Sequence, residues 1–249
     1  MNPVALITGA GSGIGKSTAQ VFLKNGWRVI GVDRRPPAAS GKSRRLIQAD
    51  LSETTAPVRI VKDVMGSERR LDALINNAAI QICKPAMNTS ATEWDEIMAT
   101  NLRAAFLMTQ ACFPLLKKSH GAIVNVSSVH AIATSENISA YAATKGALLS
   151  FTRAIALEFA PDKVRVNAVL PGAINTPMLR AGLSRGHLRG KDAERRMHEL
   201  AHRHAMGRIG RPKDVAEAIY FLAGRQTAAF ITGQSLVVDG GAIARLSTE

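Results

Sequence analysis

A glycine-rich turn between an apolar run and a helical pattern constrains the fold of this chain more than any other feature. The apolar run is Val4–Thr8, the turn occupies residues 8–15, and the helical pattern ends at Asn25-Gly26. Glycines let a backbone approach a ligand closely, and a helix amino terminus directs amide groups and a positive dipole end towards an anion. The segment therefore predicts the first strand of a parallel sheet, with a phosphate-binding turn at its end.

Strand-like and helix-like stretches alternate along the rest of the chain. Apolar runs that predict further strands occur at residues 27–32, 45–49, 71–75, 123–126 and 164–170, with a last strand and its turn at 235–241. Helical patterns occur at residues 56–65, 92–118, 141–160 and 214–223. This alternation predicts an α/β domain with a parallel sheet. Because 249 residues, 46% of them hydrophobic, suffice for one large core, we expect a single domain over residues 1–249.

Asp33 ends the second expected strand. An acid about 20 residues beyond such a glycine-rich turn binds the adenosine ribose hydroxyls of a dinucleotide. An aspartate there disfavours a 2′-phosphate and so favours NAD over NADP. Arg34 and Arg35 leave NADP open, because either side chain can reach a phosphate or stack on an adenine, or simply lie in a solvated loop.

Tyr141 and Lys145 are four residues apart in a helical pattern, so they share one helix face. A nearby cation favours phenolate, and we expect it to lower the tyrosine pKa from its ordinary value of about 10. Ser128 stands at the end of the strand expected at residues 123–126. If Ser128 converges on Tyr141, one hydroxyl can bind a substrate oxygen while the other exchanges its proton. The triplet suits alcohol oxidation or ketone reduction, although Tyr-x-x-x-Lys alone is a weak motif.

The formal net charge of +13 is concentrated in two stretches. Residues 24–45 carry seven basic residues and one acid, and residues 176–211 carry nine basic residues and three acids. The second stretch is also rich in histidine and follows Pro171-Gly172 at the end of an expected strand. We expect it to form a lid over the active site that favours a negatively charged substrate, the alternative being a solvated basic face. With 4% aromatic residues and no recognisable binding motif, nucleic acid is not an expected partner.

The sequence predicts a cytoplasmic protein that is not in a membrane. No apolar run approaches the roughly 18 residues needed to span a bilayer, and the amino terminus lacks the basic region of a signal peptide. Two cysteines are too few for a disulfide framework and match no metal-ligand spacing. His198 and His202 lie one helical turn apart without an evident third ligand, so no metal is expected.

Taken in order, these features resemble the short-chain dehydrogenase/reductase family over the whole chain. The motifs that carry the resemblance are Thr8-Gly9-x-x-x-Gly13-x-Gly15, Asp33, Asp50, Asn76-Asn77-Ala78, Asn101, Ser128, Tyr141-x-x-x-Lys145, Pro171-Gly172 and Val238-Asp239-Gly240-Gly241. Ala79 stands where the family usually has glycine, a departure that touches no catalytic group.

The resemblance implies a single-domain, doubly wound Rossmann fold with a parallel sheet of about seven strands. It also implies that Tyr141 is the acid/base, that Ser128 holds the substrate oxygen and that Lys145 binds the nicotinamide ribose. Asn101, a buried helical residue for which spacing alone predicts only a structural partner, would support a water in the proton relay. The implied cofactor-binding residues are Gly9, Ser12, Gly13, Ile14, Gly15, Asp33, Arg34, Asp50, Leu51, Asn77, Ala78, Tyr141, Lys145, Pro171, Gly172, Ile174 and Thr176. Among them, Asp50 would contact the adenine, Asn77 the ribose region and Thr176 the carboxamide.

The expected function is NAD-dependent oxidation of a small secondary alcohol, or the reverse reduction of a ketone. By resemblance the protein is a homotetramer that assembles through the helices at residues 92–118 and 141–160. One alternative is an NADPH-linked ketoreductase for 3-oxoacyl groups on an acidic carrier protein, which the net charge suits and Asp33 opposes. Another is a non-catalytic, redox-sensing dinucleotide-binding protein, against which the complete set Asn101, Ser128, Tyr141 and Lys145 argues.

Overall fold

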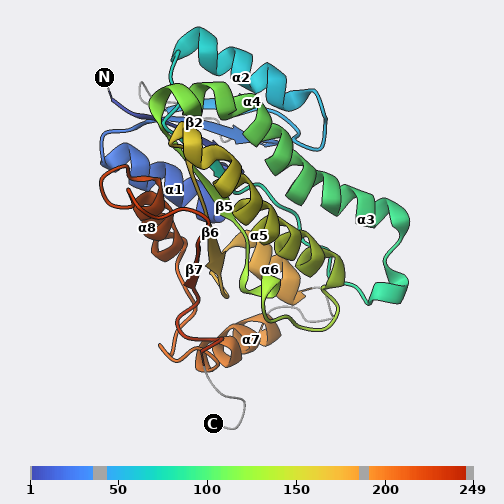
Figure 1. Ribbon diagram of the computed structural model, residues 1–249. Helices are drawn as coiled ribbons and strands as arrows, with labels where there is room; N and C mark the ends of the chain where they lie inside the picture. The colour runs from blue at the N-terminus through green and yellow to red at the C-terminus, as the bar shows by residue number, and fades with distance from the viewer. Residues whose placement is uncertain (1, 36–43, 185–190, 245–249) are drawn as a thin grey trace.

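The structure, a computed structural model, describes residues 2–35, 44–184 and 191–244. Their strands form a seven-stranded sheet in the order β3-β2-β1-β4-β5-β6-β7, and every neighbouring pair is parallel (Figure 1). The strands are β1 Val4–Thr8, β2 Arg28–Asp33, β3 Arg44–Gln48, β4 Ala73–Asn76, β5 Ala122–Val126, β6 Arg165–Pro171 and β7 Ser235–Val238. The expected single-domain α/β sheet is confirmed.

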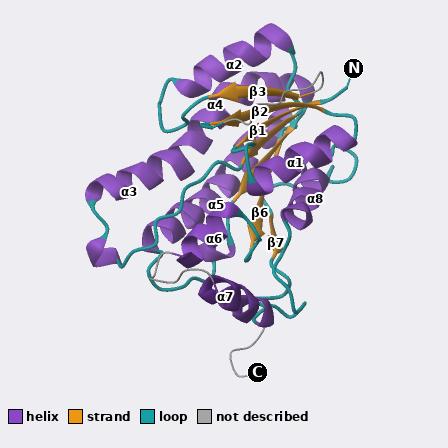
Figure 2. Ribbon diagram, turned by 180° about the vertical axis from the view of Figure 1, so that it is seen from behind, coloured by secondary structure: helices purple, strands orange, loops and turns teal. Residues whose placement is uncertain are grey.

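Helices cover both faces of the sheet because its central strands are apolar on both sides (Figure 2). Leu6 of β1 packs on one face in a core shared with α2 Ala56–Ser67 and α4 Ala104–Ser119. Its neighbour Ile7 points to the other face, in a core shared with α1 Gly13–Lys24 and α8 Pro212–Ala223. Adjacent residues on a strand therefore anchor opposite helix layers.

The strand order reverses between β1 and β4. From β1 the chain proceeds through β2 and β3 to one edge of the sheet, and from β4 it proceeds through β5, β6 and β7 to the other. The loops after β1 and β4 therefore run in opposite directions and leave a crevice at the carboxyl ends of the strands. The glycine-rich turn follows β1, and the Asn77 loop follows β4.

The single helix expected at residues 92–118 is interrupted. It consists of α3 Ala91–Met98, a π-helical segment at Ala99–Arg103, and α4. The side chain of Asn101, inside the π-helical segment, bonds to the main chain of Ile80. The hydrophobic periodicity of the sequence reveals neither this short π-helical turn nor the contact with Ile80.

The other expected elements are present with shifted ends. The helix around Tyr141 is α5 Ser139–Phe159, and the strand expected at residues 71–75 is β4. The basic segment at 176–211 contains α6 Pro177–Ser184 and α7 Lys191–His202. Figures 1 and 2 both place α6 between α5 and α7. Several of the basic residues behind the two charge stretches, among them Lys42, Arg185 and Arg189, lie outside the described residues.

Close backbone packing explains two glycines of the turn after β1. Gly9 has a φ of +66°, a left-handed conformation that residues with a side chain rarely adopt. Gly15, in the first turn of α1, lies so near Gly9 that an added Cβ would be 2.1 Å from the Gly9 carbonyl oxygen. The same Cβ would be 2.5 Å from Nδ2 of Asn77. The helix α1, the turn after β1 and the loop after β4 therefore pack so closely here that one added methyl group does not fit.

We predict that Gly15→Ala lowers the free energy of unfolding by about 1–3 kcal/mol, because the methyl group forces α1 away from the turn. The matched control is Gly66→Ala in α2, where an added Cβ meets nothing within 4 Å. That variant should be more stable than the unmutated protein by about 0.5 kcal/mol, because alanine favours the helix. Urea unfolding of the three proteins measures both changes. Equal stability of the two variants would contradict the packing argument.

Candidate active site

The carboxyl ends of the strands open into one cleft of about 750 Å³. Most of the residues implicated by sequence line it: Gly9, Ser12, Gly13, Ile14, Asp33, Arg34, Asp50, Leu51, Asn77, Ala78, Ser128, Tyr141, Lys145, Pro171, Gly172, Ile174 and Thr176. Gly15 and Asn101 do not line it. Gly15 is buried behind the turn, and Asn101 lies behind Ile80.

Asp33 is held at the end of β2 by backbone amides. Oδ2 accepts a hydrogen bond from Gly11 N at 2.8 Å, and Oδ1 accepts one from Arg35 N at 2.9 Å. A Cβ on Gly11 would lie 2.7 Å from Oδ2. Gly11 is thus a functional position that the sequence analysis missed, although it stands inside the same glycine-rich turn. Each carboxylate oxygen keeps further acceptor capacity towards the cleft.

Asn77 fixes the glycine-rich turn rather than pointing freely into the cleft. Its Nδ2 donates to the carbonyl oxygens of Thr8 at 2.9 Å and Gly9 at 3.2 Å. In return, the Thr8 hydroxyl accepts hydrogen bonds from the backbone amides of Asn77 and Ala78, at 2.9 and 3.0 Å. The loops after β1 and β4 are therefore joined by four hydrogen bonds at the strand-order reversal.

Asp50 and Arg34 lie at the same end of the cleft as Asp33. Hydrogen bonds from the Ser52 side chain and backbone hold the pKa of Asp50 below its usual range, with a smaller contribution from the Arg34 charge. The Arg34 guanidinium is 3.9 Å from the Asp50 carboxylate, and its side chain is 60% exposed. Arg34 is consequently a loosely held cation at the mouth of the cleft.

Ser128, Tyr141 and Lys145 come together at the other end of the cleft. All three are buried, with at most 8% of their surface exposed. The Ser128 hydroxyl lies within reach of the Tyr141 oxygen and acts to lower the pKa of the phenol. Lys145 Nζ donates to the carbonyl oxygen of Val126 at 2.8 Å and lies 5.4 Å from the centre of the Tyr141 ring. The convergence that the sequence left conditional is present.

The pKa of Tyr141 differs from the sequence expectation. Burial raises it to about 12, and the hydrogen bond from Ser128 only partly opposes this rise. Burial also lowers the pKa of Lys145 to about 8. We expected the Lys145 cation to lower the pKa of Tyr141, and this expectation is wrong for the protein alone. The sequence shows the spacing of the two groups, but it does not show how much hydration each group loses on burial.

Asn101 connects two walls of the site from behind. Its Oδ1 accepts from Ile80 N at 2.8 Å, and its Nδ2 donates to Ile80 O at 2.9 Å. Nδ2 also lies 3.2 Å from Oγ1 of Thr144, which donates to the backbone oxygen of Tyr141. The structural role predicted from spacing is confirmed. The side chain positions the Tyr141 turn of α5 against the loop after β4.

Several residues of the cleft wall were not singled out in the sequence: Gln81, Ser135, Glu136, Met178, Leu179, Gly182, Leu183 and Leu200. They belong to the loops after β4 and β5 and to α6 and α7. These segments have no motif, so the sequence offered no signal for single positions. Within the described residues, no group of three or more histidine, cysteine or acidic side chains is arranged to hold a metal.

We predict a pH-dependent effect of Lys145→Met on stability. Between pH 8 and 10.5 the unfolded chain binds a proton on Lys145 that the folded protein does not. The contribution of Lys145 to the free energy of unfolding of the unmutated protein therefore increases with pH over this range, and the variant lacks this contribution. The stability of the variant relative to the unmutated protein should fall by about 3 kcal/mol at most as the pH rises through it. Urea unfolding across the range tests this, and parallel curves would contradict it.

Known proteins are similar to this chain over almost its whole length. The family model described as enoyl-(acyl carrier protein) reductase matches residues 9–242. Cyclopentanol dehydrogenase of Comamonas sp. (strain NCIMB 9872) is 35% identical over 248 residues, covering 96% of each chain.

Two solved structures are also similar. Aldohexose dehydrogenase of Thermoplasma acidophilum superposes with a TM-score of 0.94 at 33% identity, covering 99% of this chain and 96% of that one. The 3-ketoacyl-(acyl-carrier-protein) reductase from Brucella melitensis, complexed with NADH, gives 0.86 at 35% identity and covers 96% and 98%. The chain therefore belongs to the short-chain dehydrogenase/reductase family and is an oxidoreductase that uses a nicotinamide cofactor to interconvert alcohols and ketones.

Proposed function

We propose that this protein transfers a hydride between NAD and a small secondary alcohol or its ketone, with Tyr141 as the proton donor and acceptor. One observation carries the proposal. The buried group of Ser128, Tyr141 and Lys145 lies at one end of a cleft whose other end presents the fixed carboxylate of Asp33. A nicotinamide dinucleotide requires both of these ends of the cleft.

The turn after β1 fits the phosphate-bearing part of the cofactor. Gly9, Gly11 and Gly13 form a cradle without side chains. An added Cβ would lie 2.8 Å from Asn77 at Gly9, 2.7 Å from Asp33 at Gly11 and 3.2 Å from Thr176 at Gly13. Gly13 packs on Thr176, so the loop after β6 closes the same cradle. The first turn of α1 contributes a helix amino terminus beside it.

Asp33 supports NAD as the preferred cofactor. Its acceptor oxygens match ribose hydroxyls, and its charge opposes a 2′-phosphate in the same place. NADP remains open because Arg34 and Arg35 are both exposed at this end of the cleft. Arg34 reaches Asp50 only at 3.9 Å, so the pair is easily separated.

The side chains divide the proton chemistry among them. When bound, the nicotinamide accepts a hydride from the alcohol carbon or donates one to the ketone. The Ser128 hydroxyl lies beside the Tyr141 oxygen and can turn its one proton towards a substrate oxygen held between them. Lys145, fixed on Val126 O, places its ammonium group where it stabilises the phenolate that forms as Tyr141 gives up its proton. Asn101 is proposed to support a water in this relay.

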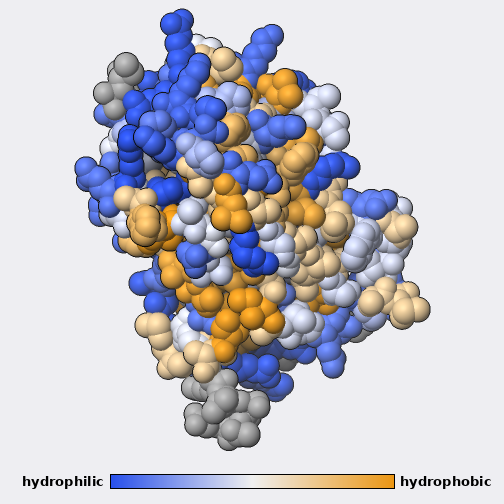
Figure 3. Space-filling view, in the orientation of Figure 1, coloured by the Kyte–Doolittle hydropathy of each residue, from blue (hydrophilic) through white to orange (hydrophobic). Residues whose placement is uncertain are grey.

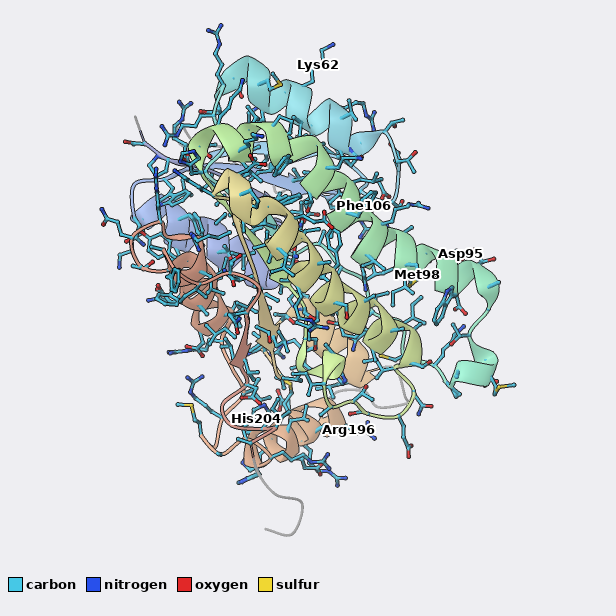
Figure 4. All side chains as sticks on the ribbon, in the orientation of Figure 1. Lys62, Asp95, Met98, Phe106, Arg196 and His204 are labelled. Atoms are coloured by element: carbon cyan, nitrogen blue, oxygen red, sulfur yellow. The ribbon has the colours of Figure 1, made fainter. Side chains whose placement is uncertain are left out.

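We also propose that residues 176–211 act as a lid over the substrate. In the described part, α6 contributes Met178 and Leu179 to the wall of the cleft, and α7 contributes Arg196 and Leu200. Figure 4 shows Arg196 on α7 at the lower end of the molecule. A cover of this kind excludes water from hydride transfer.

The proposed preference for an anionic substrate has a narrower basis than the charge total suggests. Arg195 pairs with Glu199, while Arg208 and Arg211 both pair with Asp214. The two acids of these pairs offset part of the positive charge in the described part of the segment. Among the described residues of α7, Arg196 is the arginine that lines the cleft, so it is the residue of this segment best placed to attract a substrate anion.

We further propose a cytoplasmic homotetramer assembled through α4 and α5. Apolar side chains gather on the face formed by these helices (Figure 3). Phe106 of α4 and Leu157 of α5 are 45% and 77% exposed, as expected of residues that a second subunit covers. Among the described helices, none has the length and apolar character needed to cross a bilayer.

A second candidate is an NADPH-dependent 3-oxoacyl reductase that acts on an acidic carrier protein. The similar Brucella melitensis enzyme carries the name of this activity, and the description of the family model names another reductase that acts on acyl carrier protein. The net charge of +13 suits an acidic partner. Asp33 opposes the use of NADPH. A non-catalytic redox sensor is disfavoured because the buried catalytic group is fully assembled. Turnover assays with both nucleotides and both substrate classes separate the three functions.

We predict that Tyr141→Phe lowers turnover by about 10² to 10⁴ while NAD affinity stays near that of the unmutated protein, because only the proton donor is lost. The matched control is Tyr220→Phe, which alters the other tyrosine, a residue packed on Phe22 of α1. Steady-state kinetics and NAD titration measure the two effects. A folded Tyr141→Phe protein with full activity would exclude the assigned role.

We predict that the unmutated protein prefers NAD and that Asp33→Asn lowers the NAD-to-NADP ratio of kcat/KM by about tenfold or more, since the charge that opposes the 2′-phosphate is removed. Asp50→Asn is the control, because Asp50 lies at the same end of the cleft but its carboxylate is held by Ser52. It should change the ratio less. An NADP preference before mutation would show that the arginines prevail.

A further inference from the structure

His130 occupies a defined position beside the catalytic group, and the proposed reaction gives it no role. It lies in the 3-10 helical turn Val129–Ala131, directly after β5, and lines the cleft. Its backbone N–H donates to Oγ of Ser128 at 3.2 Å. Its ring packs edge-on against the Tyr141 ring, with the ring centres 5.9 Å apart and the planes at 81°. The imidazole is thus fixed relative to both hydroxyls that hold the reacting oxygen.

The two ring nitrogens of His130 have different surroundings. Nδ1 lies 3.1 Å from Oγ1 of Thr134, which fixes the orientation of the ring. Among the described residues, no side chain pairs with Nε2. Burial also lowers the pKa of His130, so the imidazole is neutral at pH 7. A neutral Nε2 is a donor if Thr134 donates to Nδ1 and an acceptor if Thr134 accepts.

We propose that His130 is a substrate-positioning residue that hydrogen-bonds a second substrate oxygen, on a carbon next to the reacting one. The substrate class is therefore a vicinal diol or the corresponding hydroxyketone. This inference rests on the proposed function, because it assumes that the first oxygen is held by Ser128 and Tyr141.

The chemistry of Nε2 favours a hydroxyl over an anion at this position. A hydroxyl can both donate and accept, so it pairs with either tautomer of the neutral ring. A carboxylate or phosphate only accepts, so it requires the donor tautomer and would gain no charge attraction from a neutral imidazole. The cation that α7 contributes to the cleft wall is Arg196, which is a different residue from His130. Substituting Arg196 therefore distinguishes recognition of a substrate anion from recognition of a substrate hydroxyl.

The test compares matched substrates that differ by one hydroxyl group. The pairs are 1,2-cyclopentanediol with cyclopentanol and 2,3-butanediol with 2-butanol. The variants are His130→Phe, which keeps an aromatic ring beside Tyr141, His130→Gln, which keeps a donor and an acceptor, and Thr134→Val, which removes the partner of Nδ1. Arg196→Gln is the matched control in the same cleft.

We predict that the unmutated protein has a higher kcat/KM for the diol of a pair than for the mono-alcohol. His130→Phe should lower this diol-to-mono-alcohol ratio by about tenfold, mainly through the KM of the diol, because one hydrogen bond to the substrate is lost. His130→Gln should restore part of the ratio, and Thr134→Val should give an intermediate value. Arg196→Gln should leave the ratio unchanged.

Two results would overturn the inference and leave the proposed function intact. One is turnover of mono-alcohols by the unmutated protein without any preference for diols. The other is an equal loss of kcat/KM for both members of each pair in His130→Phe and His130→Gln, which would show that the ring only packs against Tyr141. Absence of turnover with every alcohol and ketone and either nucleotide would instead overturn the proposed function, and this inference with it.

Discussion

The hydrogen bonds between Thr8 and the Asn77 loop are the constraint on which the cleft depends. They join β1 and β4 at the point where the strand order reverses, and there the flanking loops would otherwise separate. The same loop also receives the first turn of α1, because Gly15 has no side chain to displace Asn77. One junction therefore fixes the glycine-rich turn relative to β4 and, through Ile80 and Asn101, relative to α5, the helix that carries Tyr141.

Burial supplies the electrostatics of the catalytic end. Desolvation raises the pKa of Tyr141 and lowers that of Lys145, so both groups are held towards their neutral forms. The Tyr141 phenol therefore keeps its proton near neutral pH in the protein alone. The Ser128 hydroxyl acts in the opposite direction and lowers the pKa of Tyr141, so the serine takes part in the proton equilibrium of the tyrosine.

Buried polar contacts also determine how the helices lie on the sheet. Asn76 of β4 donates to Asn125 of β5 at 2.9 Å, and Asn125 donates to Thr152 of α5 at 2.8 Å. Leaving one of these buried polar groups without its partner would cost about 1–3 kcal/mol of stability. The contacts therefore fix the register of α5 on the sheet. Lys145 lies on the same helix, and its position over Val126 follows from that register. The sequence indicated the buried strand and the helix, but not the polar pairs between them.

The sequence by itself determined the alternation of strands and helices, the turn after β1, Asp33 at the end of β2, and the i, i+4 pair Tyr141 and Lys145. Each of these depends on local periodicity or short spacing, which a linear pattern records. Only the tertiary structure decided the π-helical turn at Asn101, the contact between Gly11 and Asp33, the wall formed by α6 and α7, and the direction of the tyrosine pKa. Those features depend on which distant segments meet and how much water they exclude, and neither property is written in the spacing of residues.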